Sequence, residues 1–316
     1  MKTQAIRKAK LKDLSQEAWR RLRRESIGGS DAAVIMGLNP WKSRLELYCD
    51  KKGLLEDARE NEAIRLGSDL EDYVARRFSE AAGKTVKRSG YMWQHPDHRF
   101  MTANIDREIV GENALLECKT TSIMNRHHFA GGDIPLQYYV QCMHYLAVTG
   151  CDRAYLAVLV LNRGFYWYVI ERDENEIESL IQAETDFWKK HIEADIPPVA
   201  DGSDGSLNAL GRLYPEKSSV TADIRDYCGD VERYIDIGRL IKKLEAEKTG
   251  IKGRLASALG ESEKGECAAG IVSFLPVART SVNKDKLKEL YPDVYAEVSE
   301  TKVSRVLKIT ERKNLK

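Results

Sequence analysis

The sequence predicts an α+β fold, in which a central mixed β-sheet is flanked by helices and followed by a C-terminal helical arm. Three observations predict it. Helical periodicity and short runs of strand-forming residues alternate through residues 1–198. The run 153–161 is apolar on both faces, which is typical of a strand in the middle of a sheet. From residue 223 onward, helical spacing dominates and a small α+β appendage ends the chain.

Composition describes an ordinary soluble protein. Of 316 residues, 42% are hydrophobic and 31% are charged, which is enough apolar material for a core. The net charge is +1, so overall charge gives no argument for nucleic acid, although residues 1–24 hold nine basic and two acidic side chains. Six cysteines are scattered without a C-x-x-C pair, and no apolar run reaches the ~20 residues of a membrane span. We therefore expect a cytoplasmic protein without disulfides or a membrane partner.

A basic N-terminal helix is expected to end near Arg24, and a glycine pair follows it. Gly28, Gly29 and Ser30 precede a small apolar run that stops near Gly37, which predicts a capped helix start. Two interpretations stay open here. Ser30 can be a plain N-cap, or the helix start can bind a phosphate with Arg24 as its charged partner.

The next helix is predicted over residues 64–82, with one glutamate at the edge of its apolar stripe. Glu71 lies beside Ala75 and Phe78 on that helix. Because Ser68 stands three residues before Glu71, a capping box alone can explain the glutamate. A role for Glu71 in chemistry needs support from elsewhere in the chain.

A meander of strands is predicted around 86–93, 100–110 and 114–120, and it contains three residues of interest. Asp106 lies on the second strand, and a turn at Gly111 leads to the third. Glu117 and Lys119 share a face of that third strand because side chains alternate with a period of two. They can form a simple ion pair, or a metal ligand beside the group that handles an attacking water.

Two helices and two strands complete this part of the chain. The adjacent His127 and His128 do not share a face, so we read them as loop residues and not as a zinc pair. Pro135 opens a helix on which Gln141 and Tyr145 are one turn apart, a weak signal alone. Strands at 153–161 and 165–170 and a long helix at 174–194 follow.

The remaining residues are predicted to lie outside the main domain. Residues 199–222 are rich in Asp, Gly, Ser and Pro and are expected to be a linker. Residues 223–316 form the arm and the appendage, with strands at 271–275 and 303–309. The helical pattern at 223–259 is close to heptad spacing, but Gly238, Glu245 and Lys248 interrupt it, which favours a helical hairpin or a packed arm over a long coiled coil.

Four motifs, taken in their order along the chain, resemble those of the PD-(D/E)xK nuclease superfamily. Within it they resemble the bacteriophage lambda exonuclease branch and its YqaJ-type viral recombinases. Each motif alone is a weak signal, and the resemblance rests on finding all four in the same order. The sheet-end run Tyr168 to Asp173 is also typical of that branch. The four motifs are Arg24 with Ile27-Gly28-Gly29-Ser30-Asp31-Ala32-Ala33, Gly67-x-x-x-Glu71, Asp106 with Glu117-Cys118-Lys119, and Gln141-x-x-x-Tyr145.

The resemblance implies a role for each residue. Asp106 and Glu117 would be the main metal ligands, with the Cys118 backbone carbonyl as a third and Glu71 completing or supporting a second metal. Lys119 would handle the water, Gln141 would place the nucleophile or Lys119, and Tyr145 would contact DNA. Arg24, Ser30 and Asn104 would receive a 5′-phosphate. Ile105 stands where the family usually has proline. We expect Glu71, Asp106 and Glu117 to converge on one site with Lys119 at its rim.

The implied fold is restriction-endonuclease-like, and the implied activity is a Mg²⁺-dependent exonuclease, with Mn²⁺ as a substitute. It would resect the 5′-ended strand of double-stranded DNA by two-metal hydrolysis, as a homotrimer acting with a phage single-strand annealing protein in a bacterial cell. An endonuclease on the same fold and a non-catalytic DNA-binding module are the alternatives. An iron–sulfur nuclease is excluded because the cysteines form no cluster.

Overall fold

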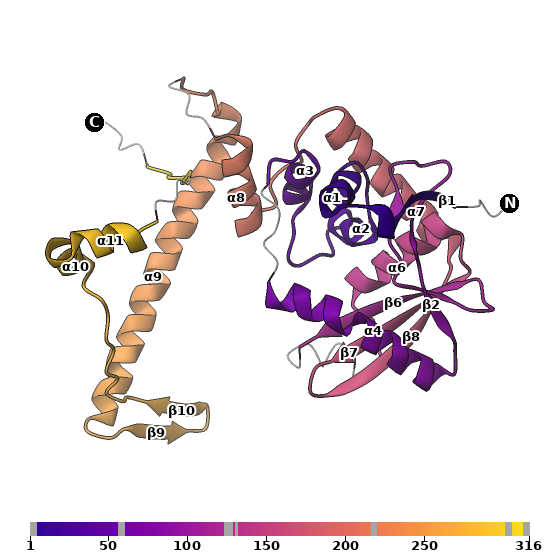
Figure 1. Cartoon of the computed structure of the whole chain (residues 1–316). Helices are drawn as coiled ribbons and strands as arrows, with labels where there is room; N and C mark the ends of the chain where they lie inside the picture. The colour runs from indigo at the N-terminus through magenta and orange to yellow at the C-terminus, as the bar shows by residue number, and fades with distance from the viewer. Residues whose placement is uncertain are drawn as a thin grey trace. The chain divides into compact units, whose positions relative to one another are not determined.

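The computed structural model describes residues 5–55, 61–122, 129, 132–215, 220–300 and 305–311. The chain divides into two compact units, Met1–Pro215 and Glu216–Lys316 (Figure 1). His127 and His128 lie outside the described residues. No helix in the described ranges is long and apolar enough to cross a membrane.

The first unit alternates helices and strands, as the sequence predicts. The long helix expected at 174–194 is α7 followed by a π-helical turn, Trp188–Glu193. Its helices are α1 (Gln16–Arg24), α2 (Gly29–Ile35), α3 (Arg44–Lys51), α4 (Glu62–Ala82), α6 (Leu136–Thr149), α7 (Glu174–Phe187) and α8 (Asp204–Leu213). Its strands are β1 (Ile6–Lys10), β2 (Val86–Arg88), β3 (Tyr91–Gln94), β4 (Thr102–Ala103), β5 (Arg107–Ile109), β6 (Ala114–Thr121), β7 (Arg153–Val160) and β8 (Gly164–Glu171).

The main sheet has five strands in the order β2-β5-β6-β7-β8. The pair β6–β7 is parallel and the other three pairs are antiparallel, so the sheet is mixed as predicted. The parallel pair needs a crossover, which α6 supplies. The strand β7 lies between β6 and β8, which confirms the central position expected from its two apolar faces.

Helices cover both faces of this sheet (Figure 1). On one face Phe78 of α4 packs with Leu116 and Tyr155. On the other face Leu146 of α6 packs with Leu115. Because side chains alternate along β6, Glu117 and Lys119 point to the α6 side, the side of Leu115.

A second, three-stranded sheet of β1, β3 and β4 lies next to α6. A fully buried pair fixes the helix there, since His144 contacts Glu184 of α7 at 2.8 Å and the Thr102 carbonyl of β4 at 2.9 Å. The carbonyl can accept but not donate, so the imidazole carries its proton on Nε2. These contacts set the position of α6, which carries Gln141.

The region predicted as a linker, 199–222, contains α8, and this corrects the prediction for residues 204–213. Ser203 caps the helix by accepting a hydrogen bond from the Ser206 amide at 3.1 Å. Ala209 is buried against α3, with Cys49 nearby. The Asp-Gly-Ser composition that suggested a loop in fact supplies a cap and an acidic first turn.

The capping-box interpretation of Glu71 is also wrong. The helix α4 starts at Glu62, where Asn61 is the N-cap, so Glu71 lies well inside the helix. The Ser68 hydroxyl instead donates to the Ile64 carbonyl one turn back. Glu71 therefore needs an explanation other than capping.

The second unit contains one long helix, a hairpin and two short helices. The helix is continuous over 32 residues, so the predicted helical hairpin is wrong. Residues 305–311 form no strand, in contrast to the prediction for 303–309. The elements are α9 (Cys228–Leu259), β9 (Lys264–Cys267), β10 (Gly270–Ser273), α10 (Lys284–Leu290) and α11 (Pro292–Val298).

Candidate functional site

The centre of the site is the pair Glu117 and Lys119 on β6. The Lys119 ammonium is 2.6 Å from Oε1 of Glu117 and lies over the ring of Tyr138, 5.4 Å from its centroid. Glu117 is 3% exposed, so its carboxylate is almost fully shielded from solvent. The shared face that the sequence predicted is confirmed.

Gln141 of α6 joins this pair from the facing layer. Its Nε2 donates to the same Oε1 of Glu117 at 2.6 Å and to the Tyr145 hydroxyl at 2.9 Å. The other oxygen of Glu117, Oε2, is buried and has no hydrogen-bond partner among the described residues. A buried carboxylate oxygen without a partner carries a desolvation cost, which a bound cation would offset.

Asp106 approaches Glu117 from the neighbouring strand, directly before β5. Its Oδ2 accepts the amide hydrogen of Cys118 at 2.7 Å. In a strand the N–H and C=O of one residue point to the same side, so the Cys118 carbonyl also points toward Asp106. Burial, and next the carboxylates of Glu117 and Glu71, raise the pKa of Asp106 well above its usual range.

Glu71 lies near this cluster, but an arginine engages it. The Arg107 guanidinium is 4% exposed and contacts Glu71 and Asp72, each at 2.5 Å. The helix α4 packs on the sheet face opposite α6, so Glu71 approaches Asp106 from the other side. The three carboxylates therefore converge only in part. Asp106 and Glu117 lie together, whereas Glu71 is close enough to Asp106 to raise its pKa but is bonded to Arg107.

The donor set suits a hard cation. Two carboxylates and a backbone carbonyl are oxygen ligands of the kind that Mg²⁺ prefers, with water filling the remaining positions. The unpaired Oε2 of Glu117 is the observation that favours such a fit. In the described parts of the chain, no three His, Cys, Asp or Glu side chains form a ready metal cage. Glu71 as a metal ligand stays a prediction.

Lys119 remains a cation in this environment. Burial alone would lower the pKa of its ammonium, but the charge and the hydrogen bond of Glu117, with a smaller contribution from Asp106, raise that pKa. A general base at this position would need burial and a metal to depress the pKa of Lys119. In the metal-free chain the carboxylates have the opposite effect, so here Lys119 is an ammonium donor.

The start of α2 meets α6 at the site. A Cβ built on Gly29 would lie 2.5 Å from the Tyr145 ring and 2.9 Å from Cγ of Gln141, so a residue with a side chain cannot fit at this position. The glycine lets the loop before α2 approach the residues that hold Glu117. Tyr145 itself is only 6% exposed, which leaves little surface for the predicted contact with DNA.

The predicted phosphate residues are only partly brought together. Ser30 is exposed, and its hydroxyl accepts a hydrogen bond from Arg23 at 3.2 Å. Arg24, the residue chosen from the sequence, lines an open groove along α1 with Arg20 and Arg21. Asn104 holds a buried Oδ1 without a hydrogen-bond partner in the described ranges.

Arg23 is the residue that sequence reasoning missed. Its guanidinium lies over the Trp19 ring, 4.9 Å from the centroid, which fixes its direction. The sequence offers a signal for it, since Trp19 and Arg23 are one helical turn apart. Behind it, Lys51 is 2.6 Å from Asp31 in a buried ion pair, and its ammonium also donates to the Arg23 carbonyl at 2.7 Å.

Comparison with known proteins gives consistent relatives. Residues 18–152 match the YqaJ-like viral recombinase domain family. The chain is 37% identical over 298 residues to the uncharacterized protein YqaJ of Bacillus subtilis, covering 92% of both chains.

Two similar solved structures have sequences less similar to this chain than that of the Bacillus subtilis protein. An alkaline exonuclease (LHK-Exo) from Laribacter hongkongensis has a TM-score of 0.49 and 21% identity, covering 57% of this chain and 94% of its own. A phage-related exonuclease from Haemophilus somnus 129PT has a TM-score of 0.43 and 15% identity, covering 56% of this chain and 100% of its own.

Proposed function

Because this chain belongs to the family of YqaJ-like viral recombinase domains, we propose that it is a metal-dependent DNA exonuclease that resects the 5′-ended strand of duplex ends. The observation that carries the proposal is the carboxylate of Glu117. One oxygen, Oε1, accepts hydrogen bonds from Lys119 and Gln141, and the other is buried without a hydrogen-bond partner among the described residues. An ion pair that served stability alone would have no use for an unpaired oxygen.

Mg²⁺ is the proposed cofactor, with Mn²⁺ as a substitute. Asp106, Glu117 and the Cys118 carbonyl would hold the ion, and Glu71 would support a second one. The metal would stabilise the charge that develops on the phosphodiester oxygens. Its positive charge would also offset the burial and the repulsion from Glu117 and Glu71 that raise the pKa of Asp106.

Lys119 and Gln141 would orient the attacking water. The Lys119 ammonium is anchored on Glu117 and its side chain is 23% exposed, so it can donate a hydrogen bond to a water or to the negative charge of the transition state. Gln141 holds Oε1 from α6, which leaves Oε2 as the oxygen for the cation. In this account Tyr145 acts through Gln141 and not through DNA contact.

Arg23 and Ser30 are the proposed receptor for the 5′-phosphate, with Arg24 and Asn104 as further candidates. A guanidinium and a hydroxyl 3.2 Å apart offer donors that match phosphate oxygens. The helix start at Gly29 brings this pair toward Gln141 on the catalytic side of the sheet. A terminal phosphate bound there would select chain ends over internal sites.

The proposal extends to the biological setting. We place the enzyme in phage-type recombination inside the bacterial cytoplasm, where a single-strand annealing protein would receive its 3′ overhangs. A homotrimer is the proposed assembly.

The test is digestion of linear duplexes labelled at the 5′ or the 3′ end, with and without a 5′-phosphate, beside supercoiled circles. Mg²⁺-dependent loss of the 5′ label, fastest with a 5′-phosphate and absent on circles, is the expected result. If circles are cut as readily as ends are resected, the enzyme is an endonuclease. If neither Mg²⁺ nor Mn²⁺ supports digestion, the chain is a DNA-binding module.

A further inference from the structure

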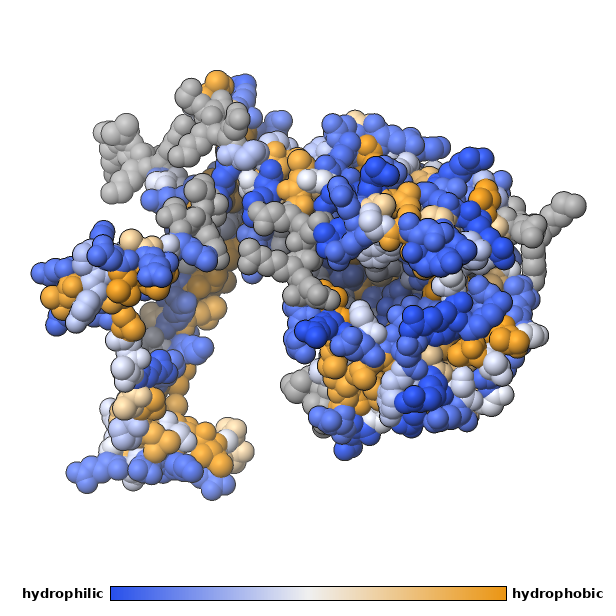
Figure 2. All heavy atoms as spheres, viewed as in Figure 1, coloured by the Kyte–Doolittle hydropathy of each residue, from blue (hydrophilic) through white to orange (hydrophobic). Residues whose placement is uncertain are grey.

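The long helix of the second unit exposes its apolar side chains. None of the 32 residues of α9 is buried within the described part of the chain. Figure 2 shows hydrophobic residues on the surface of this unit, including the hairpin β9–β10. Helices in proteins take most of their stability from packing of an apolar face. The exposed apolar face of α9 therefore lacks, among the described residues, the packing partner that would stabilise it.

The exposed residues follow a heptad register. Taking residue 234 as position a, the a and d positions from 234 to 258 hold a single charged residue, Lys248, and end at Ala258. Gly238 and Glu245 fall at e positions, so they do not interrupt this seam. The other six members are 41–57% exposed, namely Tyr234, Ile237, Ile241, Leu244, Ile251 and Leu255.

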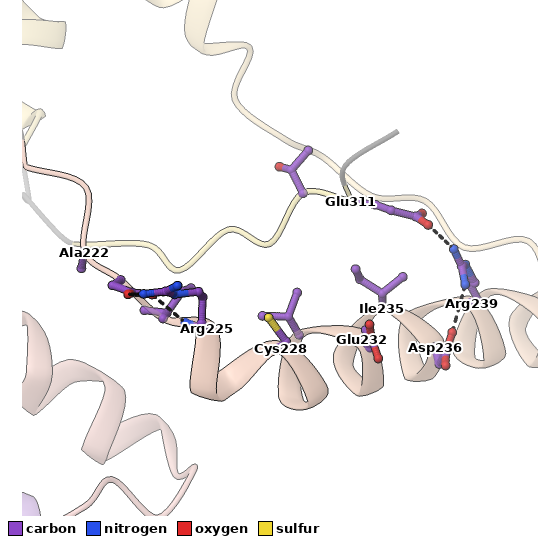
Figure 3. A pocket seen from close by; sticks show the side chains of 12 residues that line it. Ala222, Arg225, Cys228, Glu232, Ile235, Asp236, Arg239 and Glu311 are labelled. Atoms are coloured by element: carbon purple, nitrogen blue, oxygen red, sulfur yellow. Dashed lines mark hydrogen bonds and ion pairs between the residues drawn. The ribbon is translucent and has the colours of Figure 1, made fainter. Parts of the chain in front are cut away.

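The chain's own C-terminal segment covers a different face of α9. Arg239 contacts Glu311 at 2.5 Å and Asp236 at 2.9 Å, beside a groove of about 640 Å³ (Figure 3). Cys228 and Ile235 also line this groove. The six α9 residues that line it occupy b, c, e or f positions, so the a and d positions of the seam are left open.

Charge favours a protein partner with the same seam. The helix carries seven basic and five acidic residues, a mixture unlike the basic stripe of a nucleic-acid-binding helix. Glu247 at g and Lys252 at e make no ion pair within the described chain. In a parallel coiled coil, g of one strand faces the following e of the other, so Glu247 would meet Lys252 of the partner subunit.

We propose that the α9 seam pairs, parallel and in register, with the same seam of a second copy of this chain. The polar Lys248 at an a position would set the register, as single polar residues do in coiled coils. This pairing does not rest on the nuclease activity.

The test is disulfide capture in the full-length protein. The exposed Cys228 and Cys267 are first replaced by serine. Ile251→Cys at d and Gly253→Cys at f are then oxidised separately and run on non-reducing gels. Parallel pairing places both copies of position 251 together, so Ile251→Cys should cross-link at least tenfold more than Gly253→Cys. An antiparallel pair would separate the two copies.

A second pair of variants checks the seam itself. Ile241→Glu added to the Ile251→Cys protein should abolish the cross-link, whereas Ala246→Glu at the f position of the same heptad should leave it unchanged. Equal cross-linking at 251 and 253, or a cross-link that survives Ile241→Glu, would overturn the proposal. Circular dichroism of each variant confirms that the helix is retained.

Discussion

Oε1 of Glu117 accepts Lys119 and Gln141, each at 2.6 Å, while Oε2 accepts nothing among the described residues. The carboxylate is thus fixed in orientation by two donors on one side. A carboxylate fixed in this way fits the proposed role of Glu117 as a ligand of the cation.

Gln141→Leu should slow the hydrolysis of linear duplex DNA by about 10- to 100-fold. A hydrogen bond to a charged group contributes roughly 1.5–3 kcal/mol, and each ~1.4 kcal/mol is a factor of ten in rate. The rate of nucleotide release under saturating Mg²⁺ measures this. Gln182→Leu is the control, since within the described part of the chain the Gln182 side chain bonds Asp186, on the exposed side of α7. A Gln141 variant with the rate of the control would remove Gln141 from the mechanism.

Glu71→Ala should lower stability by about 1 kcal/mol and weaken Mg²⁺ binding less than Glu117→Ala does. Arg107 keeps Asp72 as a partner, and Glu71 is partly exposed, so the loss is modest. Urea unfolding and calorimetric titration with Mg²⁺ measure the two effects. Glu80→Ala, at an exposed site of the same helix, is the control. Complete loss of metal binding in Glu71→Ala would make Glu71 a principal ligand.

Arg23→Gln should reduce the preference for 5′-phosphorylated ends by about 10- to 100-fold, because a charge-assisted contact contributes roughly 1.5–3 kcal/mol. The measurement compares digestion rates on 5′-phosphate and 5′-hydroxyl duplexes. Arg21→Gln, on the exposed side of α1, should keep the preference. If Arg24→Gln loses the preference and Arg23→Gln keeps it, the choice made from the sequence is the right one.

Acid should destabilise the buried pair Asp31–Lys51. Burial alone would raise the pKa of Asp31, but the charges of Lys51 and Arg23 outweigh it and hold that pKa far below the usual range. The unfolded chain binds this proton more tightly, so the contribution is complete above about pH 4 and is lost as pH falls below it.

Asp31→Asn should therefore lower the unfolding free energy by about 3 kcal/mol at pH 7, and this difference should shrink toward pH 2. Denaturant titrations at several pH values measure it, with the exposed Asp186→Asn as control. A difference that is the same at pH 7 and pH 2 would show that the pair is not ionic.

Much of the site was predictable because it follows the two-residue period of one strand. Glu117 and Lys119 had to share a face, and Pro135 had to open a helix that carries Gln141 and Tyr145 together. The structure places Arg23, the neighbour of Arg24, against Ser30, because adjacent helical residues point about 100° apart. A motif match cannot resolve that rotation.

Other features required tertiary information. The contact of Glu71 with Arg107 joins residues 36 positions apart, so the local sequence of α4 does not predict it. The helix α8 was not predicted, because the residues that cap it have the composition of a loop. Only the packing of Ala209 against α3 shows that the segment belongs to the first unit.

Lys119→Ala tests the central claim most directly. Its ammonium is proposed to act on the water and not to hold DNA, so the variant should lose at least ~100-fold in Mg²⁺-dependent digestion of linear duplexes. DNA binding, measured by gel shift in Ca²⁺, should change less than threefold. A Lys119→Ala protein that digests duplex ends at the wild-type rate would contradict the account.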